Sequence, residues 1–267
     1  MSENSSSQFF AHLRLHTEFS ISDGLVTISP LINRLQKFRM PAAAITDLAN
    51  LFGLIKFYSS AVKAGIKPVC GCDLLIKDEA GAHTRLVLLV KDHAGYLNLT
   101  NVISDLYTDS PNHGEPVLAM SKLAGRTEGL IALSGAQQSN IGTALLAEDQ
   151  TRARQLLEQW LALFPGSFYL ELQRVGKIDE HQYIDGAITL AQETQCPVVA
   201  TNDVRFIEQE DFDAHEVRVC INERRTLNDP RRPHNYTDQQ YLKSAEEMTE
   251  LFADIPEAIQ NAWEIVK

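Results

Sequence analysis

The sequence predicts an α/β protein in which strand–helix units are wound into a sheet or a barrel. Seven short apolar segments alternate with segments of helical periodicity, as successive βα units do. No repeat of fixed period is visible, and 44% of the 267 residues are hydrophobic, enough to bury a sizeable core. Since single α/β barrels reach about 200–250 residues, one domain can account for this length.

Seven segments are predicted to be strands. The first, from Phe9 to Leu15, alternates apolar and polar residues, which indicates a strand with one buried face. The segment from Arg85 to Val90 is almost continuously apolar, which is typical of a strand buried on both faces. The other five are 42–46, 67–76, 130–135, 168–173 and 197–201.

Helices are predicted between these strands. Pro30 is tolerated in the first turn of one helix, and Gly65 closes the next. Loops are expected at 107–116 and in a basic connector at 222–236. The last helix is still in register at Lys267, which suggests a longer protein. The helices are 27–38, 51–64, 94–107, 151–164, 179–194, 211–221, 244–252 and 256 onward.

Composition and charge narrow the function classes. The net charge of −11 argues against a nucleic-acid-binding surface and favours partners with basic faces. No run of 18 apolar residues exists, so no membrane span is expected. Residues 1–9 are interpreted as a flexible tail and not a signal peptide. The four cysteines have no CxxC spacing, which fits a reducing cytoplasm.

Charged side chains recur where the predicted strands end. In a barrel these ends share one face, which is where ligands bind, and clustered His and Asp side chains could bind metal ions. A single Asp after a strand is more often a helix N-cap. Several of them with arginines interleaved are harder to explain in that way. The residues are Arg14, His16, Asp23, Asp47, Asp73, Asp203 and Arg205.

Six stretches of the chain together resemble the N-terminal PHP (polymerase and histidinol phosphatase) domain of the alpha subunits of bacterial replicative DNA polymerases. The likeness is strongest to Gram-negative alpha subunits that work with a separate proofreading subunit. It implies an irregular seven-stranded α/β barrel over residues 10–267, with a metal cluster at its C-terminal face in members that keep all their ligands. The stretches are HLRLHTEFSISDG, AAAITDLANLFGLIKFY, AGIKPVCGCDLL, GLIALSG, VVATNDVRFIEQEDFDAHEVR and EEMTELFADIPEA.

The chain departs from the ligand pattern that this resemblance implies. The opening His-x-His reads Arg14-Leu15-His16, the histidine after Asp47 is replaced by Leu48, and the bridging glutamate is Asp73. A further ligand histidine falls near Arg85, the ligand cysteine is Ala136, and the closing Asp-x-His reads Asp203-Val204-Arg205. The ligands that remain are His16, Asp23, Asp73 and Asp203.

Three of the replacements are arginines, whose positive charge can take the place of the charge of metal ions. Carboxylates without their metals would repel one another by about 4 kcal/mol per close pair at an effective dielectric constant of about 20. Guanidinium groups can supply the missing positive charge, but they have no lone pair with which to bind a metal. We therefore predict a closed pocket in which Arg14, Arg85 and Arg205 pair with members of the set Asp23, Asp47, Asp73 and Asp203.

Three functional hypotheses follow. The first is a scaffold without catalytic residues or cofactor, which docks the proofreading exonuclease (epsilon) subunit and braces the remaining polymerase domains of the same chain. The second is a residual phosphoesterase or pyrophosphatase that holds one Zn, Mn or Mg ion through His16, Asp23, Asp73 and Asp203. The third, DNA contact through the arginines at 218–232, is less favoured, so little direct DNA contact is expected. The polymerase site itself is expected beyond Lys267.

Overall fold

The structure is a computed structural model that describes residues 9–108 and 116–267. Most of the predicted tail (1–8) and most of the predicted loop at 107–116 (109–115) lie outside the described residues.

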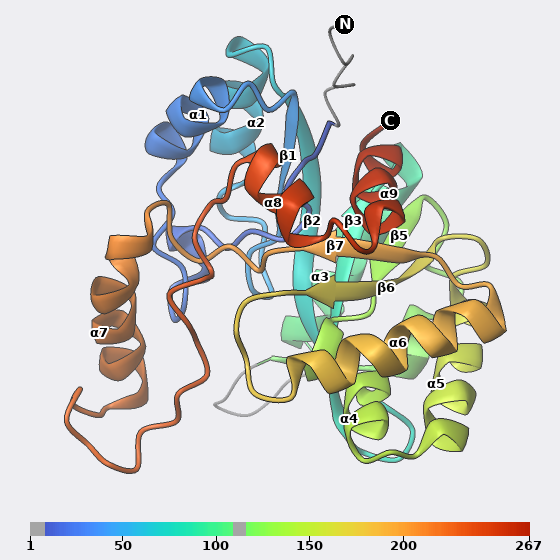
Figure 1. The fold of residues 1–267 in the computed structure, drawn as a ribbon. Helices are drawn as coiled ribbons and strands as arrows, with labels where there is room; N and C mark the ends of the chain where they lie inside the picture. Colours follow the sequence, from blue (N-terminus) through green and yellow to red (C-terminus); the bar gives the residue numbers. More distant parts are fainter. Residues whose placement is uncertain (1–8, 109–115) are drawn as a thin grey trace, which may run out of the picture.

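A curled, mixed sheet forms the centre of the molecule (Figure 1). Six strands follow one another in the order β1-β2-β3-β5-β6-β7, and β4 pairs with β2. The strands are β1 (Ala42–Ile45), β2 (Lys67–Lys77), β3 (His83–Val90), β4 (Val117–Ala119), β5 (Leu130–Leu133), β6 (Phe168–Gln173) and β7 (Val198–Thr201). The predicted barrel-like α/β class is confirmed, and β4 is a strand that the sequence did not reveal.

One strand departs from the succession of parallel βα units. β3 runs antiparallel to both of its neighbours, β2 and β5, and a short turn, not a helix, connects it to β2. An antiparallel strand begins where its neighbour ends, so the start of β3 lies beside the carboxyl end of β2. Leu75 is paired with Arg85, and Asp73 lies two residues before Leu75 on the same face. The antiparallel direction places Arg85 near the carboxyl end of β2, and the register places its side chain on the same face of the sheet as Asp73.

The predicted first strand, 9–15, is extended but is not a regular strand. The amide of Ala44 in β1 donates to the carbonyl of His12 at 2.8 Å. On the other side the amide of His16 donates to the carbonyl of Val204, just after β7, at 2.9 Å. The amide of Leu15 donates to the side-chain hydroxyl of Thr46, which interrupts the main-chain ladder. The segment nevertheless joins the two edges of the sheet, as the first strand of a barrel would.

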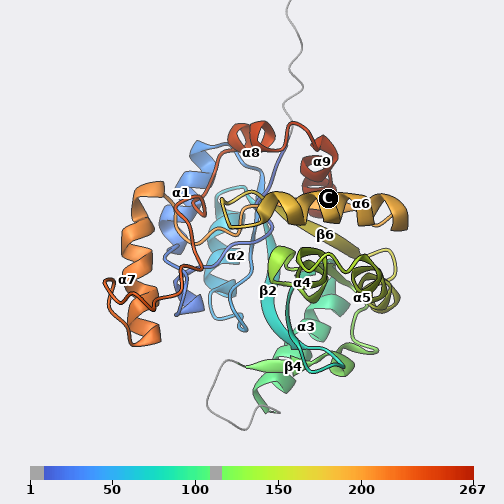
Figure 2. The same cartoon turned by 60° about the horizontal axis from the view of Figure 1, so that its bottom comes forward.

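Helices surround the sheet (Figures 1 and 2). The predicted helices are present with ends shifted by a few residues, and the short α4, capped by the Ser139 hydroxyl, was not predicted. They are α1 (Ile28–Lys37), α2 (Leu54–Lys63), α3 (His93–Thr108), α4 (Asn140–Leu146), α5 (Gln150–Leu163), α6 (Glu180–Thr194), α7 (Phe212–Glu223), α8 (Ala245–Leu251) and α9 (Pro256–Val266). In both views α7 stands apart from the sheet.

A single cluster of buried apolar side chains extends from Phe10 to Val266. Within it Trp160 stacks on Phe168 with ring centroids 6.0 Å apart. One continuous core agrees with one domain, although the boundary at residue 10 stays a prediction. In the described residues, no helix combines the length and the apolar composition needed to span a bilayer.

Candidate functional site

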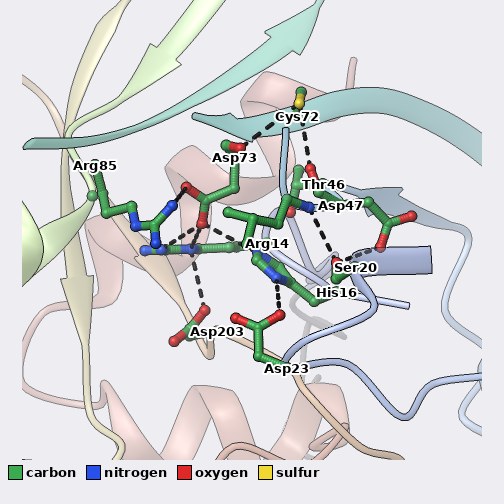
Figure 3. Close-up of polar contacts among 12 residues, drawn as sticks. Arg14, His16, Ser20, Asp23, Thr46, Asp47, Cys72, Asp73, Arg85 and Asp203 are labelled. Atoms are coloured by element: carbon green, nitrogen blue, oxygen red, sulfur yellow. Dashed lines mark hydrogen bonds and ion pairs between the residues drawn. The ribbon is translucent and has the colours of Figure 1, made fainter. Parts of the chain in front are cut away.

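Segments far apart in the sequence bring buried charged side chains together at one end of the sheet (Figure 3). The extended segment at 12–17 supplies two of them, the loop after it a third, β2 and β6 one each, and the turn after β7 two. We call this set the arginine–carboxylate cluster. Its members are Arg14, His16, Asp23, Asp73, Glu171, Asp203 and Arg205, all buried.

Arg14 lies at the centre of the arginine–carboxylate cluster and is 1% exposed. Its guanidinium contacts three carboxylates: Nη2 is 2.7 Å from Oδ2 of Asp73, Nη1 is 3.2 Å from Oε2 of Glu171, and Nε is 3.2 Å from Oδ1 of Asp203. The predicted pairing of Arg14 is confirmed for Asp73 and Asp203.

Arg205 forms the second charged centre. Its Nη2 lies 2.6 Å from Oδ1 of Asp203, and its Nη1 donates to Asp23. The guanidinium also lies over the ring of Tyr236 at 5.6 Å, and the Tyr236 hydroxyl donates to Asp23 at 3.2 Å. The predicted pairing is therefore confirmed for Arg205 as well.

His16 links the two centres. Its Nε2 is 3.1 Å from Oδ2 of Asp73, and its Nδ1 is 3.2 Å from Oδ1 of Asp23 and 2.7 Å from Nη1 of Arg205. Burial and Arg205 favour the neutral ring, but the carboxylates of Asp23 and Asp73 outweigh them and raise the pKa of His16. Both ring nitrogens are thus engaged by protein groups.

The carboxyl groups of Asp23, Asp73 and Asp203 are held in the ionised form. Burial by itself would raise their pKa values, but the guanidiniums outweigh burial. Arg14 lowers the pKa of Asp73, Arg14 and Arg205 lower that of Asp203, and Arg205 lowers that of Asp23. Lys177 adds positive charge, with Nζ 3.8 Å from Oδ2 of Asp203.

Glu171 is a member of the cluster that the sequence analysis missed. Its carboxylate accepts from Arg14, from the amide of Gly135 at 3.0 Å, from Gln173 at 2.9 Å and from the hydroxyl of Thr201. Glu171 lies inside β6 and not at a strand end, so it does not belong to the pattern of charged strand ends. A glutamate in the middle of an otherwise apolar strand was the available signal, since such a residue is buried only with partners.

Asp47 and Arg85 lie differently from the other predicted site residues. Asp47 accepts from the amide of Thr17 at 2.7 Å and from the hydroxyl of Ser20 at 2.8 Å, so it orders the turn at 17–20. Burial raises its pKa. In the described part of the chain it forms no ion pair with an arginine, and Figure 3 shows it turned away from Arg14. Arg85 is at the rim, its Nη1 4.0 Å from Oδ1 of Asp73.

The donor set does not fit a divalent metal ion. A metal needs carboxylate and imidazole lone pairs directed into a common space. Here guanidinium nitrogens of Arg14 and Arg205 lie within hydrogen-bonding distance of the carboxylates of Asp73, Asp203 and Asp23. Among residues 9–108 and 116–267, no three His, Cys, Asp or Glu side chains are grouped so that they could hold an ion. The ligand set His16, Asp23, Asp73 and Asp203 could bind one only after both arginines moved.

The match to a family model shows that this curled α/β sheet with its buried charged cluster is a protein of the PHP class. The PHP domain family matches residues 12–175, more than half of the chain, and the chain belongs to this family. Among curated proteins it is 50% identical over 260 residues to the DNA polymerase III subunit alpha of Pseudomonas aeruginosa and 45% identical over 263 residues to that of Escherichia coli K12. Each alignment covers 97% of this chain but only 22% of the relative.

A solved structure supports the fold assignment. An amidohydrolase from Chromobacterium violaceum, with bound sulfate and no metal, superposes with a TM-score of 0.54 and 14% sequence identity. The superposition covers 78% of this chain and 96% of that one. At this identity the likeness concerns the fold alone.

Proposed function

We propose that this chain is the PHP part of the alpha subunit of a cytoplasmic replicative DNA polymerase and acts there as a scaffold. In this role it docks the proofreading exonuclease (epsilon) subunit and braces the other domains of its own chain. The nucleotidyltransferase site of such a polymerase would lie outside these residues. The 50% identity to the Pseudomonas aeruginosa alpha subunit supports the assignment to this polymerase.

One observation carries the proposal of a non-catalytic role: the guanidinium of Arg14 lies among three carboxylates, Asp73, Glu171 and Asp203. An arginine stays protonated and has no lone pair, so it can neither bind a metal nor act as a general base. It can balance the buried charge and hold four chain segments together. Such a cluster is suited to a structural role.

The surface charge supports a protein partner over DNA. The chain carries a net charge of −11, which repels the phosphate backbone. Arginines of α7 and the basic connector have partners within the molecule: Arg218 donates to the carbonyl of Gly24, and Arg232 pairs with Glu216. We therefore propose little direct DNA contact.

The docking role is tested by measuring whether the full-length subunit that carries this chain binds the exonuclease subunit of the same organism. We expect a stoichiometric complex by size-exclusion chromatography with light scattering. A matching subunit from which this domain has been deleted serves as the control and should not bind. If both forms bind equally well, or neither binds, the docking proposal is wrong.

The alternative is a residual metal-dependent phosphoesterase, favoured by the contact of His16 with Asp23 and Asp73. It predicts stoichiometric Zn, Mn or Mg after dialysis, with hydrolysis of a phosphate ester or pyrophosphate that His16→Ala abolishes. The exposed His181 gives the control, because His181→Ala should leave any such activity unchanged. Metal content and hydrolysis measured on the same preparation decide between the two functions.

A further inference from the structure

The exposed side of α2 carries a row of apolar side chains. Ile55 (72% exposed), Tyr58 (54%) and Val62 (54%) recur at the spacing of one helical face, and Phe52 (65%) precedes them at the start of the helix. The opposite face buries Leu54, Phe57 and Ala61 in the core. A surface helix normally shows polar residues to solvent, so this second apolar face needs another explanation. We call Phe52, Ile55, Tyr58, Ser59 and Val62 the α2 strip.

A hollow adjoins the α2 strip. It has a volume of about 410 Å³ and lies between Phe52 and the face of α3 that carries Ile103 and Tyr107. Tyr107 is itself half exposed. A hollow with apolar walls beside an exposed apolar ridge can receive a large side chain of a partner, as the anchoring residues of protein interfaces require.

The charge of α2 itself is opposite to that of the molecule. The helix carries Lys56 and Lys63 and no Asp or Glu, whereas the whole chain has 35 acidic and 24 basic residues. The Lys56 side chain is exposed, and its only ion-pair contact within the described residues is Glu18 at 4.0 Å. The α2 strip is thus an apolar ridge flanked by two lysines of its own helix in an otherwise acidic protein.

We propose that the α2 strip docks a helix of a partner protein whose apolar face is flanked by Asp and Glu side chains. The helical ridge at 55, 58 and 62 suits packing against a second helix, and the lysines match acidic flanks. This inference rests on the proposed docking function, in which the exonuclease subunit supplies that helix. The docking function does not say which surface binds the exonuclease subunit. The inference adds that this surface is the α2 strip and that the contact combines apolar packing with Lys–carboxylate pairs.

Two other occupants fit less well. A second copy of this chain, related by a two-fold axis through the α2 strip, would bring Lys56 and Lys63 of both copies into one interface, where like charges repel. Single-stranded DNA would stack on aromatic rings, but Ile55 and Val62 offer β-branched side chains that do not stack with bases.

The test uses the full-length polymerase subunit and the exonuclease subunit of the same organism. Ile55→Glu should weaken their complex at least about tenfold in a surface-plasmon-resonance titration, because it places a carboxylate in the apolar contact. Ile221→Glu on α7 is the matched control, since Ile221 is 73% exposed and receives the same substitution. It should leave the affinity within about twofold. Equal affinities of wild type and Ile55→Glu would overturn the assignment.

A charge-reversal variant and a crosslinking measurement test the same surface independently. The double variant Lys56→Glu/Lys63→Glu leaves the apolar ridge intact and should weaken the complex and flatten its salt dependence. A benzophenone side chain at position 59 should crosslink to an acidic helical segment of the exonuclease subunit. Crosslinks to DNA, to a second copy or to another domain of the same chain would contradict the proposal.

The two proposals fail in different ways. If the wild-type subunit does not bind the exonuclease subunit at all, the docking function is wrong and the α2 assignment with it. If wild type and Ile55→Glu bind equally, the docking function stands and only the surface is wrong.

Discussion

Arg14 makes the contacts on which the arginine–carboxylate cluster most depends. Replacing it by Met would leave Asp73, Glu171 and Asp203 buried without their central cation. We expect Arg14→Met to lower the free energy of unfolding by about 3–5 kcal/mol, measured by urea unfolding at pH 7. Arg154→Met removes an exposed pair with Glu158 and should cost under about 0.5 kcal/mol. Equal costs for the two variants would contradict a structural cluster.

His12 is buried as a neutral group, unlike the charged residues of the cluster. It is fully buried, and its Nε2 donates to the carbonyl of Lys243 at 2.8 Å. Burial is the largest cause that lowers its pKa, from 6.5 to about 4. As the pH falls below 6.5 the unfolded chain takes up the proton first, so stability falls progressively until about pH 4.

The pH dependence of stability tests this state of His12. His12 should account for about 3 kcal/mol of the loss between pH 7 and pH 4, measured as the difference between the wild type and His12→Gln. His12→Gln keeps a donor near the carbonyl of Lys243 but cannot titrate, so its stability should change less over this range. Parallel pH curves for the two proteins would show that His12 is not buried in its neutral form.

At the scale of elements, the start of α3 packs against the turn that leads into β5. A Cβ on Gly95 would lie 1.8 Å from the carbonyl oxygen of Gly129. Because backbone cannot yield as a side chain can, Gly95→Ala should destabilise the fold by more than about 2 kcal/mol. Thermal and urea unfolding measure this cost.

Gly186 in α6 provides the matched control for that prediction. The nearest atom to a Cβ there is Cδ2 of Leu145 at 3.3 Å, the end of a flexible side chain. Gly186→Ala should therefore be neutral or stabilise by up to about 1 kcal/mol, since alanine favours helix. If both substitutions have the same effect, the close approach of α3 to Gly129 is not as described.

The sequence predicts long helices and strands better than short ones. Periodicity was enough to place the long helices, such as α5 and α6, because their apolar spacing extends over several turns. It missed the short β4 and α4, which have too few residues to show a period. It also gave no strand direction, so the antiparallel β3, which brings Arg85 to the rim, could not be read from its apolar run.

At the scale of the whole molecule, the arginine–carboxylate cluster joins segments that the chain separates widely. Arg205 contacts His16, 189 residues away, and Asp23, 182 residues away. The pKa of Asp23 is lowered below its usual 3.8, so its contribution to stability is present above pH 3.8 and is lost as the pH falls further.

Replacing Arg205 should reverse the pH dependence that Asp23 gives to stability. In Arg205→Met, buried Asp23 would lose its guanidinium, and burial would raise its pKa above 3.8. Protonation would then favour the folded state, so the destabilisation caused by the substitution should be smaller at pH 4 than at pH 7. Urea unfolding of both proteins at the two pH values gives the comparison. A cost that is the same at both pH values would argue against this ion pair.

The sequence by itself determined the α/β class, the positions of most elements and the arginines and carboxylates that meet at the site. Local periodicity and residue chemistry carry that information. Only the tertiary structure decided that Glu171 joins the cluster, that Asp47 turns to Thr17 and Ser20, and that residues 12–17 close the sheet. The physical reason is distance along the chain: Arg14 meets carboxylates 59 and 157 residues away. Which partners a buried charge finds depends on strand order and direction, and no local pattern specifies either.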